Sequence, residues 1–241
     1  PIPLPPLEEQ KRIAGILNKA EGIKKLREEA DKKTEELIPA IFNEMVGSRI
    51  KKGDLPADWK WVKLEDVCEV ILGQSPPSSS YRKSPEGLPF FQGKSDFGKV
   101  SPSATTWCIS PKKIAELGDI LMSVRAPVGP TNIADMKCCI GRGLAAIRCD
   151  EKIDRDFILY RLKSFESQIS YMGEGMGSVF GAITGKQLKE IPIPLPPLEE
   201  QKRIAEQLNH VEEIKKTSAE SDKKIEELKS SLLQRAFRGE L

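Results

Sequence analysis

The chain has 241 residues, of which 31% are charged and 39% hydrophobic, a composition typical of a globular protein. Its 38 Lys and Arg residues nearly balance 36 Asp and Glu residues, so the net charge of +2 does not by itself indicate a nucleic-acid partner. No apolar run is long enough to cross a bilayer, and no leader resembles a signal peptide, so we expect a cytoplasmic protein with no membrane partner. The length allows one or two domains.

The most informative feature of the sequence is a segment that occurs twice. Residues 2–14 and 193–205 both read I-P-L-P-P-L-E-E-Q-K-R-I-A, and further matches follow each copy. Alternating prolines fix the φ angle and remove backbone donors, which predicts an extended entry to each copy. Leu7 and the polar residues after it then begin a helix, with carboxylates near its positive N-terminal end.

Each copy continues with apolar residues at a spacing of three or four. This pattern predicts an amphipathic helix of about 30 residues, or roughly 45 Å. Such a helix must bury its apolar stripe, and we expect the two helices to pair in a coiled-coil-like scaffold. Packing of both helices on the core of the middle region is the alternative. The residues expected to pair the helices are Ile13, Leu17, Ile23, Leu37, Ile41, Ile204, Leu208, Val211, Ile225, Leu228 and Leu232.

Between the two copies, short apolar runs are separated by Gly, Pro and Ser. These runs predict strands at residues 59–64, 67–72, 88–91, 119–124 and 143–147, and a helix at 154–172. The fold class is therefore expected to be α+β. We predict one globular mixed α/β domain over residues 49–190, flanked by long helical repeats over residues 1–48 and 191–241.

The residues that catalysis or metal binding would need are sparse. The five cysteines form no C-x-x-C pair, and the single histidine, His210, lies in the second helical copy, so neither a zinc site nor a histidine-based triad is indicated. Residues 181–187 resemble a phosphate loop, but Phe180 stands where that motif needs its first glycine and Gln187 where it needs Ser or Thr. Residues 173–177 lack the spacing of a dinucleotide-binding fingerprint. We expect reduced, structural cysteines and no catalysis, metal or cofactor in this chain.

Polar and basic residues follow several of the predicted strands. Arg and Gln side chains can pair bidentately with base edges of DNA, whereas Lys and Ser can hold phosphates. Each of these residues alone could equally be a solvated surface group, and Arg142, between two glycines, could form a structural salt bridge. The candidate DNA-binding residues are Gln74, Ser75, Ser79, Tyr81, Arg82, Lys83, Gln92, Lys94, Lys112, Arg125 and Arg142.

Four motifs in the middle region stand in a characteristic order. They are G-Q-S-P-P at 73–77, L-P-F-F-Q-G at 88–93, G-D-I-L-M-S-V-R at 118–125 and C-I-G-R-G-L-A-A-I at 139–147. Together they resemble the target recognition domain of type I restriction–modification specificity subunits. Residues 188–201 are similar to the join between that domain and the family's helical repeat, so the resemblance covers essentially the whole chain.

The resemblance implies a non-catalytic subunit that binds double-stranded DNA. Members of the family have two recognition domains, each reading one half of a split site, and antiparallel helices between them that also bind the methyltransferase subunits. Restriction subunits join through the complex, and S-adenosylmethionine, ATP and Mg are expected only in these partner subunits. The helices thus act as a spacer between the two half-sites.

This sequence departs from the family pattern because one recognition domain lies between two helical copies. It is expected to be a half-subunit, or the C-terminal half of a full subunit. As a half-subunit, two chains would pair through their helices into a homodimer that reads a palindromic split site. A structural adaptor that no longer contacts DNA and an enzyme with an unrecognised site are the alternatives.

Overall fold

A computed structural model describes residues 6–47, 50, 55–174 and 181–238. The chain divides into two compact units, one formed by Pro1–Leu37 with His210–Leu241 and the other by Ile38–Asn209. The long helices α1 (Leu7–Phe42) and α6 (Leu198–Arg238) contribute to both units. The second unit therefore extends further into each repeat than the domain boundaries predicted at residues 48 and 191, because it begins at Ile38 and ends at Asn209. No helix within the described ranges combines the length and apolar character that crossing a membrane needs.

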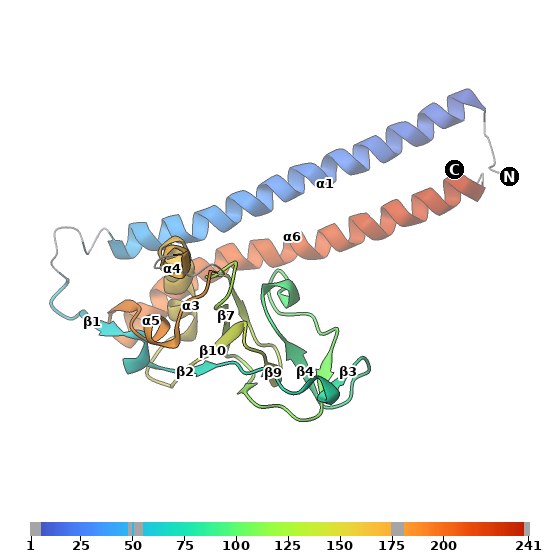
Figure 1. Cartoon of the computed structure of the whole chain (residues 1–241). Coiled ribbons are helices and arrows are strands. Elements are labelled where there is room, and N and C mark those ends of the chain that lie inside the picture. The colour runs from blue at the N-terminus through green and yellow to red at the C-terminus, as the bar shows by residue number, and fades with distance from the viewer. Residues whose placement is uncertain (1–5, 48–49, 51–54, 175–180, 239–241) are drawn as a thin grey trace. The chain divides into compact units, whose positions relative to one another are not determined.

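The first unit is a pair of antiparallel helical segments, seen side by side in Figure 1. Lys24 Nζ lies 3.5 Å from Glu226 Oε2, which joins the two helices. Predicted pairing residues of this unit are only partly covered: Ile13, Leu17, Val211 and Ile225 are half-buried. Ile23, Leu37 and Leu228 remain 49%, 50% and 59% exposed. The pair therefore leaves much of the apolar stripe uncovered.

Both helices are longer than the roughly 30 residues predicted, at 36 residues for α1 and 41 for α6. The extra turns of α1 bury Ile38 and Phe42 in the second unit, and the helix continues through Pro39, which lies between these two residues. The predicted proline-rich entry is extended in the second copy, where it forms strand β11 (Pro192–Leu195). The entry of the first copy, and the Leu232 side chain, lie outside the described residues.

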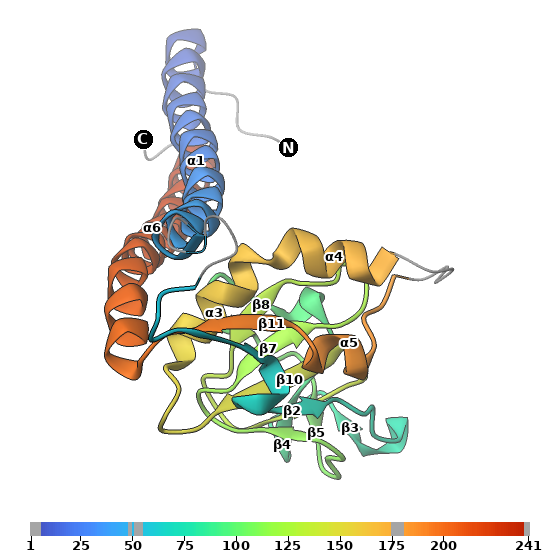
Figure 2. The ribbon, with the colours of Figure 1, turned by 90° about the vertical axis from the view of Figure 1, so that its left-hand side faces the viewer.

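The described residues of the second unit form three β-sheets, in the strand orders β2-β10-β7-β8, β3-β5-β4-β9-β6 and β1-β11. Figure 2 shows α4 (Glu166–Glu174) above strands of the first sheet, with α3 (Arg155–Ser164) to one side of them. All pairings are antiparallel except that between β4 and β9. The strands are β1 (Lys60–Lys63), β2 (Cys68–Leu72), β3 (Tyr81–Arg82), β4 (Leu88–Phe91), β5 (Trp107–Cys108), β6 (Ile114–Ala115), β7 (Ile120–Ser123), β8 (Thr131–Ile133), β9 (Cys138–Ile140) and β10 (Leu144–Cys149).

The five strands predicted from the sequence are β1, β2, β4, β7 and β10, and all five are confirmed. Those not predicted, β3, β5, β6, β8 and β9, are only two or three residues long, too short to show a pattern of alternation. The core between the sheets includes Phe91, Leu121, Ile140 and Leu144, none more than 1% exposed. The predicted mixed α/β middle region is therefore confirmed.

The described part of the second unit also includes α3 (Arg155–Ser164), α4 (Glu166–Glu174) and the short α5 (Gly185–Lys189). The prediction that residues 154–172 are helical is confirmed from Arg155 onward except at Phe165, whose backbone leaves the helical region at φ −105° and ψ 6° and divides the segment into α3 and α4. The Phe165 N–H is shared between the carbonyls of Arg161 and Leu162, which closes α3. The α3 helix packs its buried Phe157 ring 5.6 Å from that of Phe42.

Candidate nucleic-acid interface

Three turns that follow strands of different sheets meet at one place in the second unit. They are residues 73–75 after β2, residues 92–93 after β4, and residues 141–143 between β9 and β10. Gln74 N–H donates to Ile140 O at 3.1 Å, and Gly141 N–H donates to Phe91 O at 2.8 Å. Arg142 N–H donates to Ser75 Oγ at 3.3 Å. Each turn is therefore held by hydrogen bonds to another part of the cluster.

Two glycines allow these turns to approach so closely. A Cβ atom at Gly73 would lie 2.1 Å from Gly141 O, and one at Gly143 would lie 2.1 Å from Gln92 O. Both distances are far below van der Waals contact, and the atoms met are backbone atoms that cannot rotate away. The glycines of the G-Q-S-P-P and G-R-G motifs thus let the backbones pack directly against each other.

Most polar side chains on and beside these turns are exposed, whereas Ser75 is half-buried and its Oγ accepts the hydrogen bond from Arg142 N–H. Gln74, Gln92, Lys94 and Arg142 are exposed, and no side-chain hydrogen bond or ion pair joins them to any residue that the structure describes. The backbone beneath them is fixed: Asp96 Oδ2 accepts from Gln92 N–H at 2.6 Å and from Gly93 N–H at 3.3 Å. No described residue uses the side-chain donors and acceptors of Gln74, Gln92, Lys94 and Arg142, so these groups are open to a ligand.

Further cations lie beside the three turns. Lys113 O accepts from Ile140 N–H at 3.0 Å, so the exposed Lys112 and Lys113 adjoin the residue that also holds Gln74. Val124 N–H donates to Gly143 O at 2.9 Å, which brings the exposed Arg125 next to the same turn. We call this set the strand-end surface; it comprises Gln74, Ser75, Gln92, Lys94, Lys112, Lys113, Arg125 and Arg142.

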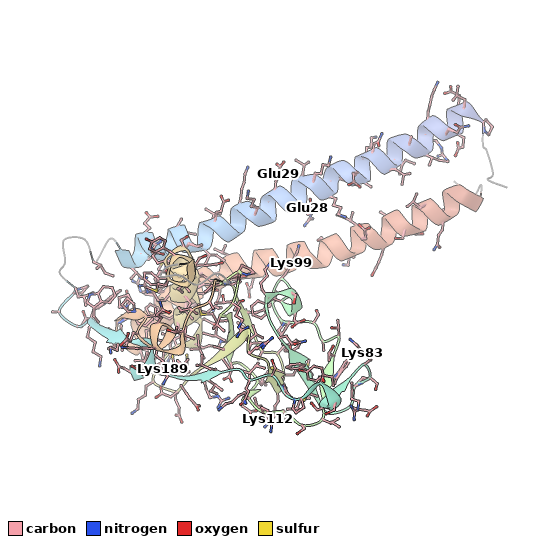
Figure 3. All side chains as sticks on the ribbon, in the orientation of Figure 1. Glu28, Glu29, Lys83, Lys99, Lys112 and Lys189 are labelled. Atoms are coloured by element: carbon pink, nitrogen blue, oxygen red, sulfur yellow. The ribbon has the colours of Figure 1, made fainter. Side chains whose placement is uncertain are left out.

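Charge is concentrated around this surface, although it is nearly balanced over the chain. Residues 70–115 contain six Lys and Arg residues and only two carboxylates, Glu86 and Asp96. Asp96 is occupied by backbone N–H groups, and Glu86 lies 3.6 Å from Arg82. Figure 3 shows Lys83 and Lys112 around the five-stranded sheet, well apart from Lys189 near α5.

Other candidate residues from the sequence are engaged in the fold. Tyr81 OH donates to Pro76 O at 2.9 Å, and its ring centroid lies 4.8 Å from that of Phe90. Arg82 Nη1 donates to the carbonyls of Ser79 and Tyr81 at 3.0 and 2.9 Å. Lys83 Nζ donates to Thr106 Oγ1 at 3.4 Å. The structure thus separates Ser79, Tyr81, Arg82 and Lys83, which support the loop after Pro77, from the strand-end surface.

Two arginines that the sequence did not single out are also structural. Arg148 makes two hydrogen bonds to buried Asp119, at 3.0 and 2.8 Å, and these bonds raise the pKa of its guanidinium. Arg161 is buried and donates two hydrogen bonds to Pro192 O, while burial lowers its pKa to about 10. Arg148 lies in a strand and Arg161 in a helix, where exposed arginines also occur, so the sequence alone does not identify these two as structural. Lys113 follows the predicted Lys112 directly, and the hydrogen bond from Ile140 N–H to its carbonyl places it beside the three turns.

Groups that could support catalysis are not gathered into a site within the described residues. No cluster of three or more His, Cys, Asp or Glu side chains there could hold a metal ion. His210 is exposed, with Nδ1 3.7 Å from Glu213 Oε2 on the same helix. Thr184 caps α5 by accepting a hydrogen bond from Gln187 N–H, so the loop that resembles a phosphate loop has a structural role. Residues 175–177 lie outside the described residues.

Comparison with known proteins gives a consistent result. The model of a family described as "Type I restriction modification DNA specificity domain" matches residues 56–230. The chain is 43% identical to the putative type I restriction enzyme MjaX specificity subunit of Methanocaldococcus jannaschii, over all of this chain and 59% of that protein. It is 28% identical to the MjaVIII specificity subunit of the same organism, over all of this chain and 62% of that protein.

Solved structures agree with these matches. The HsdS subunit from Thermoanaerobacter tengcongensis aligns with a TM-score of 0.66 at 44% identity, over all of this chain and 61% of that one. The S subunit of a type I restriction–modification system from M. genitalium aligns with a TM-score of 0.68 at 14% identity, which shows the shared fold. This chain therefore spans about three fifths of the length of the relatives that it matches.

Proposed function

The chain belongs to the family of type I restriction modification DNA specificity domains, and we propose that it is a DNA sequence-recognition subunit of such a system. The strand-end surface is the observation that carries this proposal. It combines rigid backbone with exposed Gln, Lys and Arg side chains that have no partner among the described residues. A DNA-reading surface needs this combination, because a reader that is already ordered loses less entropy on binding.

We assign two roles within the surface by side-chain chemistry. Arg142, Gln92 and Gln74 can pair bidentately with base edges, Arg with guanine and Gln with adenine. The cations Lys94, Lys112, Lys113 and Arg125 surround them and suit phosphate contacts, which position the protein but carry no sequence information. In this proposal the surface reads one half of a split site.

We further propose that the helices dock the methyltransferase subunits and set the distance between half-sites. The apolar residues left exposed on the helical unit support a docking role, because exposed Leu and Ile at regular spacing mark interaction surfaces. In this proposal methylation and cleavage, with their S-adenosylmethionine, ATP and Mg, reside in the methyltransferase and restriction subunits. This chain then contributes recognition and geometry alone.

Pairing of two chains through the helical units would supply the second recognition domain. Because a twofold axis relates identical domains, such a homodimer would read a palindromic split site. Analytical ultracentrifugation of the chain at micromolar concentration, with and without DNA, tests this part. A strict monomer in both conditions contradicts it. Mapping of methylated adenines in a genome that carries this subunit should then show two inverted half-sites with fixed spacing.

The recognition role is tested by DNA binding of the chain with its methyltransferase partner to the mapped site and to a scrambled duplex. Arg142→Ala should weaken binding to the mapped site by about 10- to 100-fold and reduce its preference over the scrambled duplex. Lys94→Gln should weaken both about equally and lower the salt dependence by about one phosphate contact. Lys60→Gln, an exposed lysine of the separate β1-β11 sheet, is the matched control and should change neither.

Each outcome has a clear reading. Salt-dependent binding with no preference for the mapped site would mean that the chain contacts only DNA phosphates or has a purely structural role. Either result would contradict sequence recognition by this chain. Methylation or cleavage by the purified chain alone would contradict its non-catalytic role. Equal losses of DNA affinity from Arg142→Ala and Lys60→Gln would mean that the recognition surface is not the strand-end surface.

A further inference from the structure

Two cysteines face each other at one end of the β2-β10 ladder. Cys68 and Cys149 are directly opposite in the antiparallel register, and their Sγ atoms lie 3.4 Å apart. Both are free thiols. The hydrogen-bonding contact with Cys149 and the burial of Cys68 both raise the pKa of the Cys68 thiol. Nothing in the proposed recognition role uses either thiol.

The ladder geometry suits a covalent link between them. Gly73 N–H donates to Leu144 O, which makes the next pair along, Leu72 and Ala145, a non-hydrogen-bonded pair. Alternation along the ladder gives the Cys68–Cys149 pair the same character. Opposite Cα atoms in such pairs are about 4.5 Å apart, inside the range that a disulfide spans.

Access to oxidants differs among the five cysteines. Cys149 is half-buried at the end of its strand, whereas Cys108, Cys138 and Cys139 are fully buried. Burial also raises the pKa of the Cys138 and Cys139 thiols to about 12, so they react slowly as nucleophiles. Cys149 is therefore the thiol that an external reagent reaches first, and Cys68, 7% exposed, lies behind it as the resolving thiol.

The position of this pair in the chain gives the link its consequence. Cys68 and Cys149 bracket residues 69–148, which include the whole five-stranded sheet and all of the strand-end surface. The pair lies at the end of β2 opposite to Gly73 and Gln74. A bond between the two thiols would close this segment at its base without touching the exposed surface.

We propose that Cys68 and Cys149 form a reversible disulfide that fastens the segment carrying the strand-end surface. The Cys149 thiolate attacks a low-molecular-weight disulfide such as oxidised glutathione, forms a mixed disulfide and releases one thiol. Cys68 then loses its proton and attacks Cys149 Sγ, releasing the second thiol. Two electrons pass from the cysteine pair to the external disulfide, and its two halves leave as two thiols.

Oxidation of the purified full chain with oxidised glutathione tests this inference. Thiol titration under denaturing conditions should fall from five to three, and non-reducing peptide mapping should find Cys68 joined to Cys149. The melting temperature should rise by roughly 10 °C, because the link closes a long loop in the unfolded chain, and dithiothreitol should reverse the rise. DNA affinity should stay unchanged.

Single variants Cys68→Ala and Cys149→Ala should abolish the rise in melting temperature on oxidation. If a variant folds poorly, peptide mapping of the chain without substitutions still shows whether Cys68 and Cys149 are joined. Five titratable thiols after oxidation, a stable glutathione adduct on Cys149, or a bridge between other cysteines would each overturn the inference. So would a Cys68–Cys149 bond that leaves the melting temperature unchanged.

Discussion

The two copies of the repeat have the same residues in different surroundings. In the second copy Ile204, Ala205 and Leu208 are at most 2% exposed, within the unit that includes α3 and the sheets. In the first copy the matching Ile13 and Leu17 are half-buried and Ala14 is exposed. An identical sequence is thus core in one place and surface in the other.

Local contacts, by contrast, are the same in both copies. Arg12 pairs with Glu9 at 2.8 Å, and Arg203 pairs with Glu200 at 2.7 Å. These contacts join residues three apart on one helix, so they need only the helix itself. The comparison shows that sequence identity preserves contacts within a helix, while burial depends on what the rest of the chain places against it.

The largest expected difference between the copies comes from their matched leucines. Leu208→Ala should lower the free energy of unfolding by about 2–5 kcal/mol, because it leaves a cavity in a closed core. Leu17→Ala at the matching position should cost less than half of that, since the side chain is only half-buried. Urea denaturation of both variants measures the difference. Equal losses would mean that the first copy is covered as fully as the second in solution.

A second expected effect concerns the anchor of the second copy. Arg161→Ala removes both hydrogen bonds to Pro192 O, at 3.2 and 2.9 Å, where β11 begins. The free energy of unfolding should fall by about 2–3 kcal/mol, as for hydrogen bonds made by a charged donor. Arg161→Lys should recover only part of this, because a single ammonium group cannot reproduce two bonds from a planar guanidinium. Full recovery by lysine would contradict a role for that geometry.

The matched glutamines should differ less. Gln201 accepts from Asp154 N–H at 2.9 Å and donates to Pro196 O at 2.9 Å, and it is 2% exposed. Gln201→Ala should therefore lower the free energy of unfolding by about 1–3 kcal/mol. Gln10→Ala, at the half-buried matching position, should have a smaller effect. Thermal denaturation compares the two variants. A larger loss of stability from Gln10→Ala than from Gln201→Ala would contradict the conclusion that the second copy is the more deeply buried one.

The smallest effects should come from the repeated ion pairs, and they should be alike. Arg12→Gln and Arg203→Gln remove exposed pairs that water and salt already weaken. The hydrogen bond from Arg12 lowers the pKa of Glu9, so its small contribution is present at neutral pH and lost as pH falls through the lowered pKa. NMR titration should show the Glu9 pKa rising in Arg12→Gln. Clearly different melting temperatures for the two variants would contradict a purely local role.

Much of the fold followed from local pattern. The proline entry with Glu-Glu-Gln after it predicted the start of α6 at Leu198 and of α1 at Leu7, and alternating apolar runs predicted the longer strands. The short strands were missed because two or three residues carry no periodic signal. The break at Phe165 was missed because both sides of it are good helix-forming sequence with continuous apolar spacing.

The candidate site was also predictable only in part. The G-Q-S-P-P and G-R-G motifs placed Gln74 and Arg142 on turns, and Gln92 followed a strand as predicted. Whether a side chain is free for a ligand depended in part on partners distant in sequence, such as Asp119, which lies 29 positions before Arg148 and binds its guanidinium. Arg82 and Arg142 look alike in the sequence, yet one is bonded to the carbonyls of Ser79 and Tyr81 and the other is exposed without a partner among the described residues.

The sequence by itself therefore determined the repeat, the helices that it forms and the ion pairs along them, because these depend on neighbours within a few residues. Only the tertiary structure decided which copy is buried, which polar residues gather at the strand-end surface and which cysteines face each other. Those outcomes depend on contacts between residues tens of positions apart, such as the 81 positions between Cys68 and Cys149. No local pattern encodes such contacts, since they arise only when separate strands pair in one register.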